Sequence, residues 1–377
     1  CARPRWRAGT ALALMPSVNP LPLPVTLGVI ANPVSARDIR RVVAHAGNLQ
    51  VTERVNIVLR LLQGARAAGV THALLMPDRG GIRALLERHL GRQHAYRHEG
   101  TDDQRLPAIE FLDFDPTSTV DDTYAATRLM LQRGVGAIVV LGGDGTHRAV
   151  VRELVAAGSR VPLAGLSTGT NNAFPEMREP TITGMAAALV AAGRVDATLA
   201  LAPNKLVEVN ITSARGRQCR DIAIVDAVVT HDRTVGARAL WKPQSLAAAY
   251  LAYAEPGAIG LSSIGGLLQP VGRLERGGLA VQIAHNGAPA LTTLHAPIAP
   301  GLVLPVPLAG WQRMAADEPL PVLLRAGTVA LDGERELAFD EGDHVTATLR
   351  EHAFLTVDVA RCMATAAHEG LLRAAPI

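Results

Sequence analysis

Short apolar runs alternate with longer amphipathic stretches along the first half of the chain. The apolar runs predict strands at 26–31, 72–76, 109–114, 137–141 and 162–166. Apolar residues at helical spacing predict helices at 52–68, 81–90, 122–132, 147–157 and 183–192. Glycines of the kind that ends a helix follow several of these stretches, at Gly69, Gly91, Gly134 and Gly158. Strands and helices that alternate at this spacing predict an α/β domain with a doubly wound parallel sheet.

Apolar segments separated by turn residues replace this alternation in the second half of the chain. Strands are predicted at 206–212, 219–230, 279–284, 322–331 and 345–349, with turns at 213–217 and 331–334. We therefore expect a second domain that is mainly antiparallel β. The predicted limits are 25–193 for the α/β domain, 194–350 for the β domain, and 351–377 for a C-terminal segment that packs back on the first domain.

The first residues do not follow either pattern. Arg3, Arg5 and Arg7 precede a short apolar run at 11–14 and several prolines. A basic start with an apolar run is typical of targeting peptides, but this run is too short for one. We predict that residues 1–24 are a disordered leader outside the fold, with a natural start at Met15 as an alternative.

Composition narrows the classes of function. With Lys+Arg 37 against Asp+Glu 34, the net charge is +3, and aromatic residues make up only 3% of the chain, so we expect no nucleic-acid partner. The three cysteines are too few and too far apart for a disulfide framework or a zinc site, which favours a reducing, cytoplasmic location. Prolines interrupt the longest uncharged stretch, 286–312, so no membrane-spanning segment is expected.

A glycine-rich loop with one carboxylate follows the strand at 137–141, and it reads Gly142-Gly143-Asp144-Gly145-Thr146. Glycines expose consecutive N–H groups, and Thr146 can cap the next helix, whose N-terminus favours anions. Asp144 would repel a phosphate unless a cation or a hydroxyl lies between them. This predicts either Mg²⁺ coordination or a general base for an alcohol nucleophile. The alternative is that Asp144 only forms a tight turn.

A second polar loop follows the strand at 162–166, and it reads Ser167-Thr168-Gly169-Thr170-Asn171-Asn172. Its hydroxyls and amides suit ribose or phosphate oxygens, although taken alone it is as well explained as a loop that caps a helix. Ligands bind beyond the carboxyl ends of the strands in doubly wound sheets, and both loops are expected at such ends. Together the loops favour a kinase-type enzyme.

The two loops resemble motifs of the superfamily that contains NAD kinases, diacylglycerol-type lipid kinases and sphingosine kinases. Weaker similarities follow at 223–229, 255–263, 295–300 and 332–334, so the resemblance covers about 25–350. Within the superfamily, residues 30–41 look most like the NAD-kinase-like proteins encoded with acetoin catabolism, the acetoin X group. The resemblance implies a two-domain NAD kinase-like fold with a nucleotide-binding first domain and an acceptor-binding second domain.

The resemblance also implies a reaction, in which ATP with Mg²⁺ phosphorylates the 2′-hydroxyl of NAD to give NADP. Asp144 would be the catalytic base or a Mg²⁺ ligand, and Glu334 a supporting carboxylate. The residues implied in nucleotide and phosphate binding are Asn32, Gly142, Gly143, Gly145, Thr146, Thr168, Gly169, Thr170 and Asn171. Those implied in acceptor binding are Asn172, Asp226, Ser262 and Ser263. A homodimer or homotetramer is the expectation for the family.

The acceptor side departs from the NAD kinase pattern. Val225 stands where those enzymes have Asn, Asp226 is one methylene shorter than their Glu, and 261–266 lacks their tyrosine-bearing signature. Hydrogen-bonding groups set most of the selectivity for such a substrate. Two alternatives to NAD phosphorylation therefore stay open: a kinase for another hydroxylated metabolite linked to acetoin catabolism, and a nucleotide-binding sensor without activity. A lipid acceptor is disfavoured because no basic amphipathic helix is evident.

Overall fold

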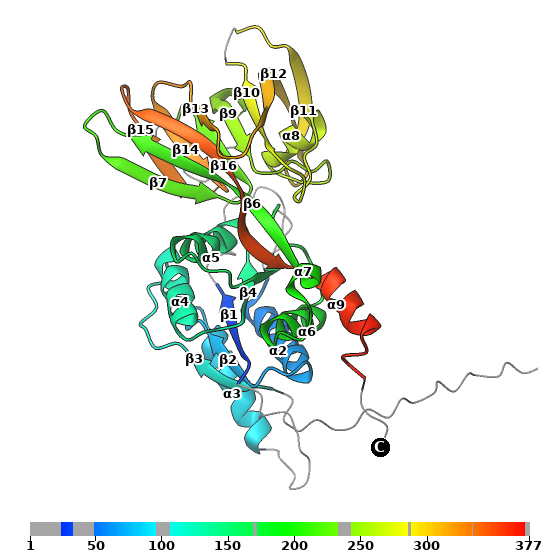
Figure 1. Cartoon of the computed structure of the whole chain (residues 1–377). Helices are drawn as coiled ribbons and strands as arrows, with labels where there is room; N and C mark the ends of the chain where they lie inside the picture. The colour runs from blue at the N-terminus through cyan, green and yellow to red at the C-terminus, as the bar shows by residue number, and fades with distance from the viewer. Residues whose placement is uncertain are drawn as a thin grey trace, which may run out of the picture.

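The first domain is built on parallel strands, as the apolar runs predict (Figure 1). The computed structural model describes residues 24–32, 49–95, 106–168, 172–232, 243–285, 288–333 and 335–373. The parallel strands lie in the order β3-β2-β1-β4-β5. Their bounds are β1 Thr26–Ala31, β2 His72–Leu75, β3 Ala108–Phe111, β4 Ala137–Gly142 and β5 Leu163–Ser167.

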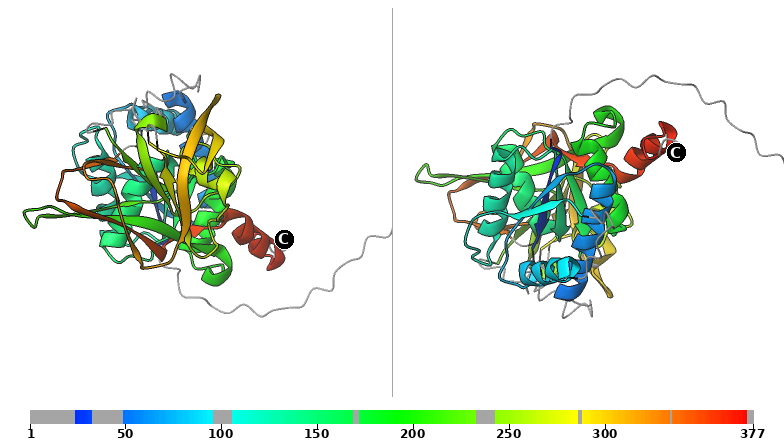
Figure 2. Two further views of the ribbon diagram at one scale, coloured as in Figure 1. Left: turned by 90° about the horizontal axis from the view of Figure 1, so that it is seen from above. Right: turned by 90° about the horizontal axis from the view of Figure 1, so that it is seen from below.

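Helices cover both faces of this sheet (Figure 2). Their bounds are α2 Val51–Ala67, α3 Ile82–Ala95, α4 Val120–Gln132, α5 Asp144–Ala156 and α6 Pro180–Ala191. Side chains alternate along β4, so Ile138 and Val140 pack with residues of α4 and α5, while Val139 packs with residues of α2 and α6. Strands buried on both faces read as continuous apolar runs for this reason.

Two glycines allow α2 and α6 to approach closely. A Cβ at Gly64 would lie 2.2 Å from the Thr181 carbonyl oxygen, and a Cβ at Gly184 would lie 2.1 Å from that of Leu61. Neither position can hold a larger residue unless the backbones move apart. The close packing of α6 on α2 sets the position of α6. It therefore also sets where the segment between β5 and α6 ends.

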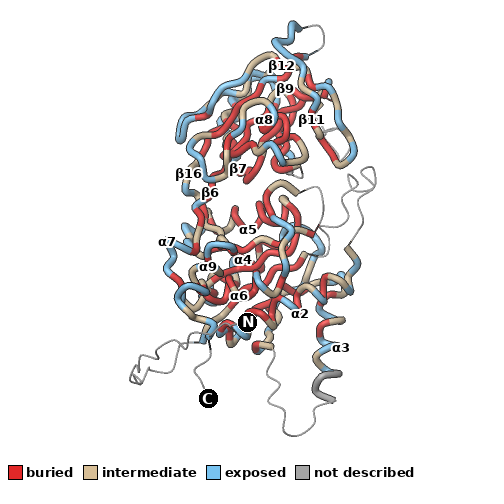
Figure 3. Tube along the Cα trace, turned by 90° about the vertical axis from the view of Figure 1, so that its right-hand side faces the viewer, coloured by how far each residue is buried: buried red, intermediate tan, exposed pale blue. Residues whose placement is uncertain are grey.

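The second domain continues the first sheet and adds another. Strands β6 Leu201–Thr212, β7 Gln218–Ala223, β13 Pro319–Pro321 and β16 His344–Val357 extend the nine-stranded sheet, in which β16 pairs with β5 through Thr356 and Leu163. Figure 3 shows β6 and β16 running between the two domains. The predicted fold class, an α/β domain followed by a mainly antiparallel β domain, is confirmed.

A seven-stranded antiparallel sheet packs on this extension in the order β11-β12-β10-β9-β8-β14-β15. Its bounds are β8 Asp226–Thr230, β9 Leu246–Leu251, β10 Gly278–Ile283, β11 Thr292–Ala299, β12 Leu302–Met314, β14 Gly327–Leu331 and β15 Arg335–Phe339. Short helical segments complete the domain, namely α7 Ala197–Ala200, the 3₁₀ turn Pro243–Ser245 and α8 Ser262–Leu268. The last helix, α9 Val359–His368, packs on α6 of the first domain.

Several element limits differ from the predictions. Helix α3 continues through Gly91 to Ala95, and α5 begins at Asp144, three residues before the predicted start. The predicted strand at 219–230 is two strands in different sheets, β7 and β8. The strand predicted at 322–331 is only β14, while that at 345–349 is the much longer β16. These limits depend on hydrogen-bonded pairing with strands far away in the sequence. The pattern of apolar residues within a segment does not predict that pairing.

Two further findings concern the wider predictions. Within the described ranges, no helix is both long enough and apolar enough to cross a bilayer. Cys219 is exposed and Cys362 is buried, and both are free thiols. The predicted leader, apart from Pro24, lies outside the described residues.

Candidate active site

The glycine-rich loop is packed tightly against its own surroundings. Strand β4 ends at Gly142, and α5 begins at Asp144 with Gly143 before it. A Cβ at Gly142 would lie 2.7 Å from the Thr146 Cβ, and one at Gly143 would lie 2.9 Å from the Asn172 Oδ1. The glycines are therefore required by groups of the protein itself. Thr146 is buried against Gly142. The loop is therefore short, and it passes directly into the first turn of α5.

The carboxylate of Asp144 binds the two residues that directly follow the second predicted loop. Its Oδ2 accepts a hydrogen bond from the Ala173 amide and its Oδ1 one from the Phe174 amide, both at 2.9 Å. The side chain is half-buried in the first turn of α5, where the helix dipole also favours a negative charge. The loop after β5 thus fixes the direction of this carboxylate without enclosing it.

Other predicted nucleotide-binding residues lie around the same strand ends. The Asn32 amide donates to the Leu141 carbonyl at 3.4 Å, next to Gly142, and the Asn32 carbonyl accepts from Arg54 Nη1 at 2.6 Å. Thr168 is buried, and Asn172 Nδ2 donates to Ser167 Oγ at 2.8 Å. Gly169, Thr170, Asn171 and Glu334 lie outside the described residues. Their predicted roles, like those of the other site residues, stay predictions.

His147 was not singled out from the sequence, yet it supports the loop. Its ring is fully buried, and Nδ1 donates to the Gly143 carbonyl at 2.8 Å. Burial, with a smaller contribution from the charge of Arg273, lowers the pKa of His147 to about 4. The imidazole is therefore neutral at pH 7. The sequence signal is its position four residues after Gly143, on the first turn of the helix.

Another aspartate, in the second domain, is buried. Asp332, just after β14, accepts hydrogen bonds from the amides of Ile224, Val225 and Asp226 at 2.9, 2.8 and 3.2 Å. Burial, and then the charge of Asp226, raise the pKa of Asp332 well above its usual range, with a smaller contribution from Asp144. Glu334, the predicted supporting carboxylate, lies outside the described residues, so its role stays a prediction.

Two predicted acceptor-binding residues are enclosed elsewhere. Ser262 and Ser263 begin α8, which packs with β9, β10 and β11 in a separate apolar cluster, and both side chains are buried. The Ser263 hydroxyl donates to the Gly260 carbonyl at 2.6 Å. This placement favours a structural role for both serines, so their contact with an acceptor stays a prediction without support from the geometry. Asp226, by contrast, is half-buried at the start of β8 and electrostatically coupled to Asp332.

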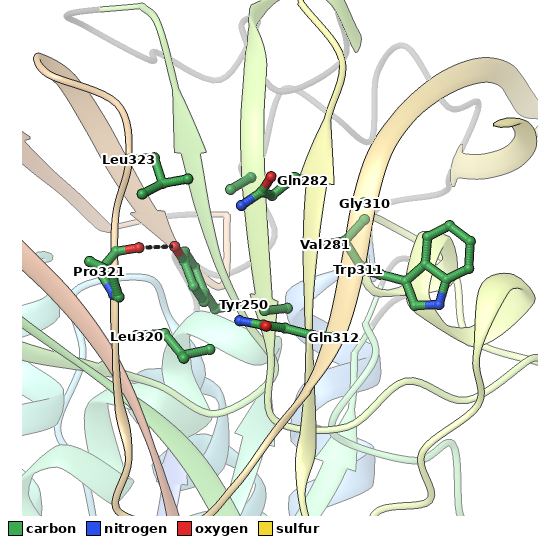
Figure 4. A pocket seen from close by; sticks show the side chains of 11 residues that line it. Tyr250, Val281, Gln282, Gly310, Trp311, Gln312, Leu320, Pro321 and Leu323 are labelled. Carbon is green, nitrogen blue, oxygen red and sulfur yellow. Dashed lines mark hydrogen bonds between the residues drawn. The ribbon is translucent and has the colours of Figure 1, made fainter. Parts of the chain in front are cut away.

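The described residues line at least two cavities. One, of about 390 Å³, lies at the seam of the domains, where Phe174, Arg178, Glu255, Arg273 and Asp358 are among its walls. The other, of about 330 Å³, lies in the second domain beside β9, β10 and β12, where the Tyr250 hydroxyl donates to the Pro321 carbonyl at 3.0 Å (Figure 4). Of the predicted site residues, none lines either cavity.

The described residues hold no preformed metal cluster. They contain no group of three or more His, Cys, Asp or Glu side chains placed to hold a metal ion. Asp144 offers a carboxylate oxygen where β4 ends, and a single carboxylate fits an ion that arrives with a nucleotide better than a resident one.

Two family models match separate parts of the chain. Residues 27–195 match the family model of the ATP-NAD kinase N-terminal domain, and residues 205–352 match that of the acetoin catabolism protein X C-terminal domain. The acetoin catabolism protein X of Cupriavidus necator is 56% identical over 350 residues, which cover 93% of this chain and 94% of that protein. These matches support a kinase-like function with a small-molecule substrate.

Solved structures of kinases are more distant. Yeast NADH kinase complexed with NADH gives a TM-score of 0.48 at 11% identity, over 94% of this chain and 90% of that one. A diacylglycerol kinase from Bacillus anthracis gives 0.39 at 12% identity, over 88% of this chain and 96% of that one. Likenesses at this distance carry no information on the substrate.

Proposed function

The chain belongs to the acetoin catabolism protein X family, and we propose that it is an ATP-dependent kinase that phosphorylates the 2′-hydroxyl of NAD. One observation carries the proposal. The carboxylate of Asp144, at the N-terminus of α5, is oriented by the amides of Ala173 and Phe174, so both polar loops and a single acid meet at the ends of β4 and β5. A cytoplasmic location and a homo-oligomeric state remain predictions.

The proposed chemistry needs little more than position and charge. An acceptor hydroxyl beside Asp144 would give its proton to the carboxylate as its oxygen bonds to the γ-phosphorus of ATP, and the bond to the departing ADP oxygen breaks. The N-terminus of α5 would stabilise the phosphates. Mg²⁺ bound to ATP would neutralise further charge, and Asp144 is the described residue placed to meet it.

A different small acceptor is the second candidate. The burial of Ser262 and Ser263 favours it, because hydroxyls that would hold NAD by resemblance are enclosed in the β domain. The amide of Val225 already donates to Asp332, so it is not available to bind an acceptor. We infer that the acceptor in this case is a hydroxylated metabolite connected with acetoin breakdown, as the name of the relative suggests.

Purified protein with Mg-ATP and NAD tests the first candidate. NADP is measured with an NADP-specific dehydrogenase, and ADP release is followed in parallel with acetoin and small diols as acceptors. Asp144→Asn should lower turnover by roughly 100-fold or more, the contribution of a positioned base, while ATP affinity is kept. The matched control is Asp113→Asn, which changes an exposed carboxylate just after β3, three strands from β4.

The outcomes separate the candidates. NADP formation that depends on Asp144 and not on Asp113 supports NAD phosphorylation. ADP release with a diol and none with NAD supports the second candidate. ATP binding without ADP release for any acceptor contradicts both and leaves a nucleotide sensor.

A further inference from the structure

Side chains of the second domain bind the backbone segment whose amides donate to Asp144. The amides of Ala173 and Phe174 point to the Asp144 carboxylate, and their carbonyls are bound from the other domain. Arg273 Nη2 donates to the Phe174 carbonyl at 2.8 Å and to the Ala173 carbonyl at 3.2 Å. The Tyr253 hydroxyl donates to the Ala173 carbonyl at 3.1 Å. Ala173 and Phe174 are thus restrained on two sides. Their N–H groups donate to the Asp144 carboxylate, and their carbonyls accept from the Arg273 guanidinium.

The guanidinium of Arg273 is itself firmly placed. It lies over the ring of Phe174, 4.7 Å from the centroid, and over that of Tyr253, 4.8 Å from the centroid. Arg273 Nη2 also donates to the Tyr253 hydroxyl at 3.2 Å. A planar guanidinium can stack flat between two rings while it donates to carbonyls at its edge, and a lysine ammonium has no plane with which to stack.

The loop that carries Arg273 is anchored by a buried lysine. Lys205 of β6 donates to the carbonyls of Gly272, Glu275 and Gly277 at 3.0, 2.6 and 2.7 Å. Burial lowers the pKa of Lys205 to about 8, so all three donors are present in most molecules at pH 7. Because Lys205 anchors the loop that carries Arg273, we infer that Arg273 restrains the 173–174 backbone.

We propose that Arg273 is a positioning residue for Asp144, which acts through the peptide groups of Ala173 and Phe174 across the domain boundary. This inference rests on the proposed kinase function. A cation on the two carbonyls polarises the peptide groups and strengthens their N–H donation to the carboxylate. The direction of the Asp144 carboxylate then depends on contacts that the second domain supplies. No local motif marks Arg273, which lies about 100 residues from the carbonyls that it binds.

Arg273→Gln and Arg273→Lys test the proposal beside Arg276→Gln. Arg276 lies in the same loop and its side chain is exposed, so it is a matched control. Arg273→Gln should lower kcat by roughly 100-fold, as expected for a misplaced catalytic group, with KM for ATP nearly unchanged. Arg273→Lys should recover part of this loss. The acid limb of the pH profile should move to higher pH in Arg273→Gln, because weaker amide donors stabilise the Asp144 carboxylate less.

Two further measurements distinguish positioning from stability. Asp144→Asn combined with Arg273→Gln should be little worse than Asp144→Asn alone, because both changes act on one group. Hydrogen exchange of the segment 172–178 should become roughly tenfold faster in Arg273→Gln and stay unchanged in Arg276→Gln. This second readout needs no activity. If the wild type proves inactive with every acceptor, the proposed function fails and exchange alone decides on positioning.

Clear results would overturn the inference. Unchanged exchange at 172–178 in Arg273→Gln would show that the guanidinium does not restrain this backbone. A loss of activity that matches the loss of folded protein, with an unmoved acid limb and additive effects with Asp144→Asn, would assign Arg273 a purely structural role.

Discussion

Asp144 and Asp332 are both followed by glycine, yet the fold uses them differently. Each carboxylate accepts main-chain N–H bonds from a distant part of the chain, Asp144 from residues 173 and 174, Asp332 from residues 224 to 226. Asp144 is half-buried in the first turn of a helix. Asp332 is only 6% exposed and has a left-handed backbone with φ of 50°. The two carboxylates therefore differ in exposure and not in motif: solvent reaches Asp144, whereas Asp332 is enclosed.

The buried aspartate organises the path of the chain. Its partners, Ile224 and Val225, lie at the break between β7 and β8, where the chain leaves one sheet and enters the other. Their amides have no strand partner at this break, and Asp332 supplies one. The comparison therefore predicts that Asp332 matters for stability and Asp144 for activity.

Asp332→Ala should cause the largest loss of stability. It leaves three amides without acceptors in a buried place and puts alanine into a left-handed conformation, which together should lower the free energy of unfolding by about 4 kcal/mol. Asp144→Ala should cost only about 1 kcal/mol, since water can reach its partly exposed surroundings. Urea unfolding measures both. Equal losses in the two variants would contradict the distinction drawn from burial.

Breaking a buried ion pair near Asp332 should cause the second-largest loss of stability. Arg148 of α5 and Asp221 of β7 are both 3% exposed, and their Nη1 and Oδ1 atoms are 3.5 Å apart without a well-aligned hydrogen bond. Asp221→Asn would leave the guanidinium buried without this partner and should lower the free energy of unfolding by about 3 kcal/mol. The double variant Arg148→Met with Asp221→Leu should cost less in the same urea titration. A greater cost for the double variant would mean that the pair is strongly net stabilising.

The first domain shows how far the sequence alone could reach. Strand β1 begins and ends where its apolar run predicts, and Gly69, Gly134 and Gly158 have the positive φ expected after helices. These features depend on near neighbours in sequence. The two polar loops were expected to meet for a topological reason, and Asp144 binds the two residues that directly follow the second loop.

The contacts that complete the site depend on residues far apart in the chain. Tyr253 and Arg273 reach the 173–174 carbonyls from another domain, and Asp332 binds amides more than 100 residues before it. No spacing rule connects such positions. Burial is equally hard to foresee: Ser262 and Ser263 are polar residues that α8 covers when it packs on its sheet, and their predicted contact with an acceptor stays a prediction.

His147 extends the comparison to pH. Its pKa of about 4 in the folded state is below the ordinary value of 6.5, so the unfolded chain binds the proton first as the pH falls. Stability should therefore decrease from about pH 6.5 towards pH 4, with His147 contributing a loss of about 2 kcal/mol at pH 5. His147→Asn keeps a donor for the Gly143 carbonyl and cannot titrate. Unfolding free energies of both proteins from pH 7 to pH 4 should converge on acidification, and parallel curves would exclude His147 as the cause.

Tyr253→Phe should produce the smallest effect and the most selective one. Burial raises the pKa of Tyr253, so its hydroxyl is protonated and donates to the Ala173 carbonyl at 3.1 Å. Arg273 still binds the same carbonyl when this hydroxyl is removed, so the free energy of unfolding should fall by only about 1 kcal/mol. Turnover should fall by roughly threefold, because the backbone that aims Asp144 loses one of its restraints. Tyr250→Phe removes a similar hydroxyl bond to a carbonyl, beside the cavity of the second domain, and is the matched control. An equal drop in turnover for both variants would show that general stability, and not the path to Asp144, limits activity.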